Sequence, residues 1–196
     1  MSTAIPPKLM TIEEFEALPD DGIDRELIRG ELRIRGVAEV NGMTRRNRFH
    51  AGTEATLAKI IGNWIDQQPP PRGKVYSGEV GCILSRDPDT TVGIDVAYIS
   101  AQSLDRQTSD TTMIEGPPVL AVEILSPSDK LENVNEKVDE YLASGVSLVW
   151  VVDPHFQTVT VFQSGVEPEL FNKQQTLTAA PHLPWLSIDV KAIFER

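Results

Sequence analysis

The sequence predicts an α+β protein in which helices flank a central mixed β-sheet, preceded by an N-terminal helix and a β-hairpin. Three observations support this prediction. Apolar runs of strand length recur at 92–100, 119–125 and 147–152. Two longer segments, 45–67 and 130–144, repeat apolar residues at helical spacing. The strands come in runs with helices on either side, which is typical of α+β or mixed sheets rather than regular strand–helix alternation.

Length and composition favour a globular protein. A chain of 196 residues suits one domain with a sizeable core. The hydrophobic share of 40% and the charged share of 24% exclude wholesale disorder. The single cysteine, Cys82, forms no intramolecular disulfide, and no apolar run reaches the length of about 18 residues expected of a membrane span. The N-terminus lacks a secretory signal, so we expect a cytoplasmic protein without membrane contact.

The formal net charge is −11. Because binding to nucleic-acid phosphates needs Lys and Arg, this charge argues against general electrostatic binding of nucleic acid over the protein surface. It leaves room for a local basic patch, and Arg45, Arg46 and Arg48 form one near the start of the long helical segment. Phosphate binding and a solvated helix end are both interpretations of this cluster.

The N-terminal elements are a short helix and a hairpin. Residues 11–18 are predicted to be helical because Thr11 can cap the helix and Glu14 follows three residues later. Residues 25–28 and 32–35 are predicted strands joined by a short turn that contains an Arg-Gly pair.

The middle of the chain begins with the long helix 45–67, which three consecutive prolines end. Short strands are predicted at 74–77 and 81–84. The apolar strand 92–100 comes next, and a polar loop spans 102–116.

The second half is predicted as strand 119–125, helix 130–144 and strand 147–152, followed by a hairpin partner at 158–163. A short strand or helix is expected within 186–194. The buried face of the helix is expected to consist of Leu131, Val134, Val138, Tyr141 and Leu142.

Two apolar strands each carry one acid, Asp95 in VGIDVAYIS and Glu123 in VLAVEIL. A buried charge is costly unless it is paired or bound to a cation. Carboxylates on neighbouring strands would repel each other unless a divalent cation lay between them. Mg²⁺ suits such a pair, with Mn²⁺ as an alternative, since hard cations are held by carboxylates, waters and substrate phosphates. Such a metal polarises a phosphodiester, and a nearby lysine would orient the attacking water.

The sequence resembles the Uma2-like proteins (DUF820), a bacterial group within the PD-(D/E)XK, or restriction-endonuclease-like, nuclease superfamily. The resemblance rests on six segments in this order: TIEEFEALPDD, RELIRGEL, RFHAGTEATL, GIDVAYIS, PPVLAVEILSPSD and EKVDEYLASGVSLVWVVDP. It runs roughly from Thr11 to Val161, and it implies one restriction-endonuclease-like domain over 1–196 with its core at about 11–163. It also implies a metal-dependent endonuclease that hydrolyses phosphodiester bonds in nucleic acid, with DNA expected before RNA. A homodimer is expected because cutting two strands favours two sites.

The resemblance places the superfamily's Pro-Asp pair on Ile94-Asp95 and its Glu-X-Lys motif on the segment from Glu123 to Leu125. The proline is replaced by Ile94, which leaves the aspartate in place. The lysine is replaced by Leu125, which shares a strand face with Glu123 and brings no ammonium to the metal.

Relatives often take this lysine from the following helix, where the matching position is Lys137. Its stem could extend along apolar surface toward the strand. Lys130, one heptad earlier, is the alternative. The resemblance thus implies Asp95, Glu123 and Lys137 as catalytic residues, with Asp95 and Glu123 as the metal ligands.

Several other residues have two interpretations. Glu26 either approaches the metal or pairs with an arginine, and His50 is a candidate base or, preferably, a buried and satisfied histidine. Glu79 and Asp129 are weaker candidates, and Asp129 is explained as an acid at a helix start. The three tryptophans are expected in the core: Trp64, Trp150 and Trp185.

Two further hypotheses stand beside the nuclease. Leu125 and the net charge of −11 favour a non-catalytic member of the fold that acts in binding or regulation. The other is a structural domain in a larger assembly.

Overall fold

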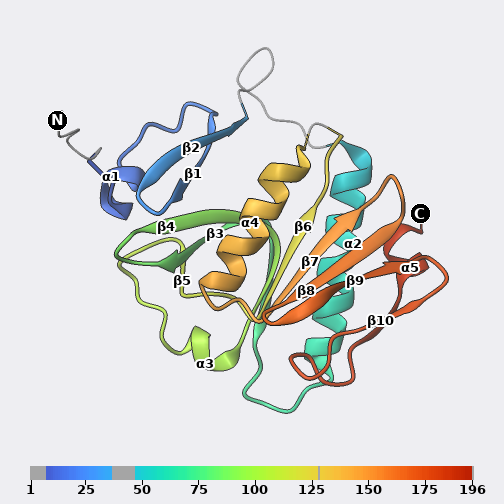
Figure 1. Ribbon diagram of the computed structural model, residues 1–196. Helices are drawn as coiled ribbons and strands as arrows, with labels where there is room; N and C mark the ends of the chain where they lie inside the picture. The colour runs from blue at the N-terminus through green and yellow to red at the C-terminus, as the bar shows by residue number, and fades with distance from the viewer. Residues whose placement is uncertain (1–7, 37–46, 128, 196) are drawn as a thin grey trace.

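The computed structural model describes residues 8–36, 47–127 and 129–195 (Figure 1). The nine strands of its main sheet are β1 (Asp24–Ile28), β2 (Glu31–Gly36), β3 (Lys74–Ser85), β4 (Thr90–Ile99), β5 (Ile114–Glu115), β6 (Leu120–Ile124), β7 (Leu148–Asp153), β8 (Thr158–Gln163) and β9 (Val166–Asn172). A second sheet pairs β10 (Thr176–Thr178) with β11 (Ser187–Asp189). The helices in the described ranges are α1 (Ile12–Glu16), α2 (Arg48–Asp66), α3 (Ala101–Leu104), α4 (Leu131–Ala143) and α5 (Val190–Phe194). The predicted α+β class, a mixed sheet flanked by helices, is confirmed.

The main sheet has the strand order β2-β1-β4-β6-β7-β8-β9, with β3 paired to β4 and β5 to β3. It is mixed because β6 and β7 are parallel while the other pairs on this path are antiparallel. Helices α4 and α2 cover opposite faces (Figure 1). Alternation along the strands builds the two layers, since Val122 and Trp150 pack on the α2 side while Ala121 and Val149 pack on the α4 side. No described helix is both long and apolar enough to cross a membrane.

The N-terminal helix and hairpin are confirmed. Thr11 caps α1, and Glu14 completes the capping box by accepting the Thr11 backbone N–H. The hairpin turns at Arg29 and Gly30, whose φ angles are both positive, at 52° and 76°. Two consecutive positive φ values match the right-handed twist of paired strands, so the Arg-Gly pair can serve as a tight hairpin turn.

Helix α2 begins at Arg48, because the Asn47 side chain accepts the N–H groups of the next turn. The predicted start at residue 45 and two members of the basic cluster, Arg45 and Arg46, lie outside the described residues. The third member, Arg48, is exposed, and its guanidinium lies 4.8 Å from the centre of the Phe49 ring.

The two strands predicted at 74–77 and 81–84 form one strand, β3, with a bulge. Its register shifts between Ser77 and Val80, so that two residues, Gly78 and Glu79, oppose one residue of β4, Asp95. Both bulge residues have positive φ, 91° and 57°. A bulge changes the direction of the neighbouring backbone, and this bulge lies directly beside Asp95, a predicted site residue.

Two predictions about burial are wrong. Leu131 is 73% exposed because it begins α4 and its side chain lies beyond the packed turns of the helix. Trp185 is 85% exposed in a loop and has a φ of 63°, whereas Trp64 and Trp150 are buried as expected.

Several elements were not predicted. The loop 102–116 contains the end of α3 and the short strand β5. Beyond residue 163, β9 forms the outer edge of the sheet; all but one of its residues are exposed, and it includes Pro168. Edge strands tolerate proline and need no apolar alternation, so the sequence lacks the usual strand signal there.

Candidate functional site

The site lies where the main sheet opens along one edge of β4. Thr91 pairs with Leu27 of β1 on this edge and with Ile83 of β3 on the other. Strand β6 shares the first edge but pairs only with Val96 to Tyr98. Within the described strands, β4 residues 92–95 therefore have no strand partner on this edge, and β1 and β6 diverge around them.

Asp95 lies at the end of this opening. Its Oδ2 accepts the backbone N–H of Ile124 at 2.7 Å, while its Oδ1 accepts no hydrogen bond from the residues described. Burial would raise the pKa of Asp95, but the His50 imidazole, the Ile124 N–H and the Lys137 ammonium together hold this pKa below its usual value. The carboxylate is therefore ionised at neutral pH, with one oxygen fixed and the other available.

Lys137 reaches into the opening from α4. Its Nζ donates to Glu123 Oε2 at 2.9 Å and to the Gly93 carbonyl, in the unpaired stretch of β4, also at 2.9 Å. It also lies 3.2 Å from Glu26 Oε1. The ammonium is buried and contacts three strands, so α4 brings to Glu123 the positive charge that Leu125 cannot supply. The alternative, Lys130, is exposed at the N-cap of the helix.

Glu123 is held through both carboxylate oxygens. Tyr141 donates its hydroxyl to Oε1 at 2.6 Å, and Lys137 donates to Oε2. The sequence analysis placed Tyr141 in the apolar face of α4 and missed this role. The available signal was its spacing, because residues four apart on a helix share a face and Tyr141 follows Lys137 by one turn.

His50 differs from the satisfied histidine that we expected. Its side chain is 1% exposed, and neither ring nitrogen forms a hydrogen bond with the described residues. Its Nε2 lies 3.3 Å from Asp95 Oδ2, and its Nδ1 lies 3.8 Å from Glu54 Oε2. The imidazole thus contacts a site carboxylate without meeting hydrogen-bond geometry.

The remaining candidates lie at or behind the margin of the site. Glu79 is exposed on the β3 bulge, and Asp129 accepts the Ser126 backbone N–H, which closes the turn before α4. Cys82 is fully buried, and burial raises the pKa of its thiol to about 12 although the Lys137 ammonium opposes the rise. A thiol with this pKa is no nucleophile at neutral pH.

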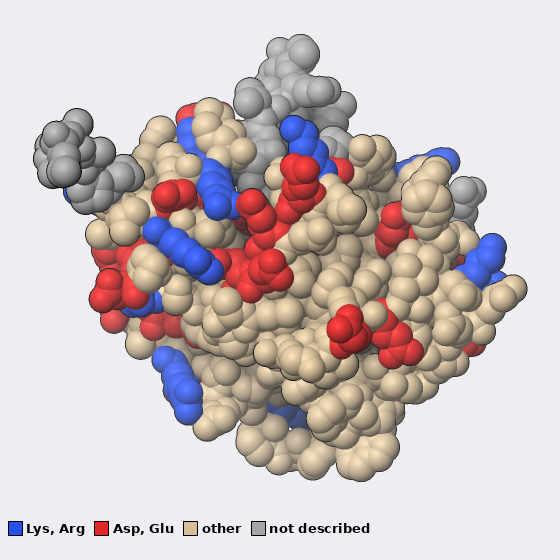
Figure 2. All heavy atoms as spheres, viewed as in Figure 1, with Lys and Arg blue, Asp and Glu red and all other residues tan. Residues whose placement is uncertain are grey.

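Ion pairs fasten the β1–β2 hairpin to α4 beside the site. Arg29 Nη2 and Nε each lie 3.0 Å from Glu140 Oε2, and Arg33 Nη1 lies 2.7 Å from Glu136 Oε2. Figure 2 shows acidic and basic side chains gathered where the hairpin meets the helix. These pairs, with the Lys137–Glu26 contact, hold Glu26 against the ammonium.

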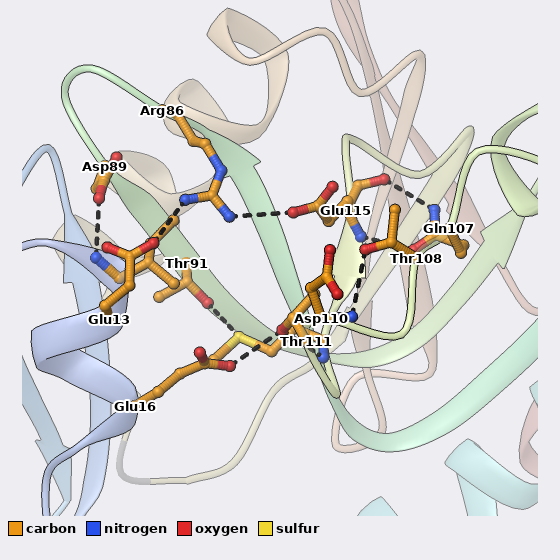
Figure 3. Close-up of polar contacts among 12 residues, drawn as sticks. Glu13, Glu16, Arg86, Asp89, Thr91, Gln107, Thr108, Asp110, Thr111 and Glu115 are labelled. Atoms are coloured by element: carbon orange, nitrogen blue, oxygen red, sulfur yellow. Dashed lines mark hydrogen bonds and ion pairs between the residues drawn. The ribbon is translucent and has the colours of Figure 1, made fainter.

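A second polar cluster joins α1 to the turn before β4, to β5 and to the segment before β5 (Figure 3). Arg86 bridges Glu13 at 3.1 Å and Glu115 at 3.0 Å, and Asp89 Oδ2 accepts the Ile12 backbone N–H at 2.8 Å. Each charge in this bridge has a partner from another segment, so we assign the cluster a structural role.

The donor set of the opening fits a hard divalent cation. Its acids present oxygen ligands, and Asp95 Oδ1 has no competing hydrogen bond among the described residues. In the described ranges, no three His, Cys, Asp or Glu side chains form a ready metal cluster, and Lys137 lies between Glu26 and Glu123. These residues therefore fit a hard divalent cation held by two carboxylates and completed by waters and substrate oxygens, rather than an all-protein cage.

Comparison with known proteins agrees with this architecture. No protein of curated function matches the chain. The crystal structure of a protein from Anabaena variabilis, described as "a putative nuclease belonging to DUF820", has a TM-score of 0.75 at 20% identity, covering 94% of this chain and 97% of that one. This likeness shows a shared fold. A family model, Uma2, described as "Putative restriction endonuclease", matches residues 12–191, and the chain therefore belongs to the Uma2 family.

Proposed function

We propose that this protein is a metal-dependent endonuclease that hydrolyses phosphodiester bonds in DNA. The family description and the fold shared with a protein described as a nuclease support the reaction class. The observation that carries the proposal is the convergence of Asp95, Glu123 and Lys137 in one opening of the sheet.

Each residue has a defined role in this proposal. Asp95 and Glu123 hold Mg²⁺ or Mn²⁺, which when bound polarises the phosphodiester and lowers the pKa of a bound water. The Lys137 ammonium orients the attacking water and stabilises negative charge that develops on the phosphate oxygens. Tyr141 holds Glu123 in place through its hydroxyl. The Glu123 carboxylate therefore keeps its orientation when Lys137 exchanges its contact with Glu123 for one with the attacking water. A homodimer is part of the proposal, since cutting two strands favours two sites.

Cleavage of supercoiled plasmid tests the proposal. The wild type is expected to nick or linearise the plasmid with Mg²⁺ or Mn²⁺ and to stop when EDTA is added. Asp95→Ala and Glu123→Ala are expected to abolish cleavage. Asp139→Ala is the matched control, because it removes an exposed carboxylate from α4 and should leave cleavage intact. Equal cleavage by all four proteins would mark a contaminant and reject the proposal.

A non-catalytic binding role is the second candidate, and one observation favours it. An ammonium has three protons, and Lys137 donates two of them, to Glu123 and to the Gly93 carbonyl, while its Nζ also lies 3.2 Å from Glu26 Oε1. If the lysine keeps these contacts, it has little capacity left to orient a water. DNA binding by fluorescence anisotropy, without cleavage in either metal, would favour this role.

A further inference from the structure

His50 is a buried polar side chain that the proposed chemistry does not yet use. It lies in the first turn of α2, where its backbone N–H donates to Asn47 Oδ1 at 3.0 Å. This cap fixes the start of the helix and therefore the direction of the imidazole. Burying a polar group without a hydrogen bond is costly, and such groups are rare in folded proteins. A buried ring whose two nitrogens lack a hydrogen bond with the described residues therefore calls for a functional explanation.

The imidazole meets Asp95 on one carboxylate oxygen only. Its Nε2 lies 3.3 Å from Oδ2, the same oxygen that accepts the Ile124 backbone N–H at 2.7 Å. Oδ2 is thus approached by a helix and by the neighbouring strand β6, while Oδ1 accepts no hydrogen bond within the described residues. Hydrogen bonds at catalytic sites are often long in the free protein and shorten when the site is loaded.

We infer that His50 is a positioning residue that holds Asp95 Oδ2 through its Nε2 and thereby directs Oδ1 toward the cation site. This inference rests on the proposed function and deepens it. The Glu54 carboxylate has at most a minor part, since 3.8 Å from Nδ1 is too long for a direct hydrogen bond.

Matched variants of His50 distinguish a role in positioning Asp95 from a role in packing. His50→Leu fills the space with an apolar side chain and removes the nitrogen, whereas His50→Gln can return an amide nitrogen near the position of Nε2. Loss of a side chain that orients a metal ligand typically weakens metal binding about 10–100-fold. We expect His50→Leu to bind Mn²⁺ weaker by about this factor and His50→Gln to regain most of the affinity. Glu54→Gln should bind Mn²⁺ as the wild type does.

The stability of His50→Leu is a second readout beside its affinity for Mn²⁺. Because His50→Leu replaces a buried polar group that lacks a hydrogen bond with an apolar one, the gain should offset the lost contact with Asp95, and its Tm without metal should stay close to that of the wild type. A merely structural histidine would instead lose Tm on replacement and leave the affinity per folded molecule unchanged. The inference therefore predicts weaker metal binding in a protein whose stability is close to that of the wild type.

The experiment is isothermal titration of Mn²⁺ into the wild type and the three variants, with Tm measured in EDTA. Weak binding by folded His50→Leu and recovery in His50→Gln support the inference. Wild-type affinity in His50→Leu overturns it while leaving the proposed function standing. A ¹⁴N coupling to bound Mn²⁺ in pulsed EPR of the wild type, lost in His50→Leu, would make His50 a ligand and also overturn positioning. A wild type that binds no Mn²⁺ overturns both this inference and the proposed metal site.

Discussion

Replacing Lys137 by methionine would leave two buried carboxylates without their shared cation. The Glu26 and Glu123 side chains are only 7% and 10% exposed, and the ammonium lies 3.2 Å and 2.9 Å from their oxygens. Removing one partner from a buried ion pair costs about 3–5 kcal/mol, because the remaining charge stays buried. For a chain of this length each kcal/mol lowers Tm by about 2–4 °C, so the expected fall is roughly 6–20 °C in EDTA.

A divalent cation should reverse much of this loss. With the ammonium gone, Mg²⁺ or Mn²⁺ can take its place as counter-charge to the acids. A ligand that binds only the folded state also raises Tm by mass action. Lys137→Met should therefore show a larger metal-dependent rise in Tm than the wild type, although it should no longer cleave DNA.

Differential scanning calorimetry measures both effects. Lys130→Met is the matched control, because it removes an exposed lysine one heptad away at the N-cap of α4, and it should keep the wild-type Tm and activity. Adding Glu123→Gln to Lys137→Met removes one of the two carboxylate charges and should recover part of the loss. A Lys137→Met protein with wild-type Tm in EDTA would refute the assignment of the ammonium as counter-charge.

Two further predictions concern groups that surround the site. Tyr141→Phe should destabilise the fold by about 1–3 kcal/mol in urea unfolding, because a buried carboxylate oxygen loses its 2.6 Å donor; unchanged stability would show that water replaces the hydroxyl. Cys82, whose pKa is raised to about 12, should resist a thiol reagent at pH 8 in the native protein and react at once in denaturant. Labelling of the native protein at the rate of a free thiol would contradict its burial.

Local signals were sufficient for much of the fold. The Thr11 capping box and the apolar strands can each be identified within a few residues, since caps and side-chain alternation are properties of neighbouring residues. The same logic identifies Asp95 and Glu123, because an acid within an apolar run stands out. It fails at β9, where an exposed edge strand has no apolar pattern, and at Trp185, where residue type predicts burial and the loop exposes the ring.

The sequence by itself thus determined most of the strands, most of the helices and the two acids that interrupt apolar strands. Only the tertiary structure decided that Lys137 rather than Lys130 enters the opening, and that Tyr141 and His50 each contact one of the acids. These contacts join residues between 14 and 45 positions apart, as from Glu123 to Lys137 and from His50 to Asp95. Their geometry depends on how α2 and α4 lie across β4 and β6, and side-chain spacing within one element shows which residues share a face but not which strand that face meets.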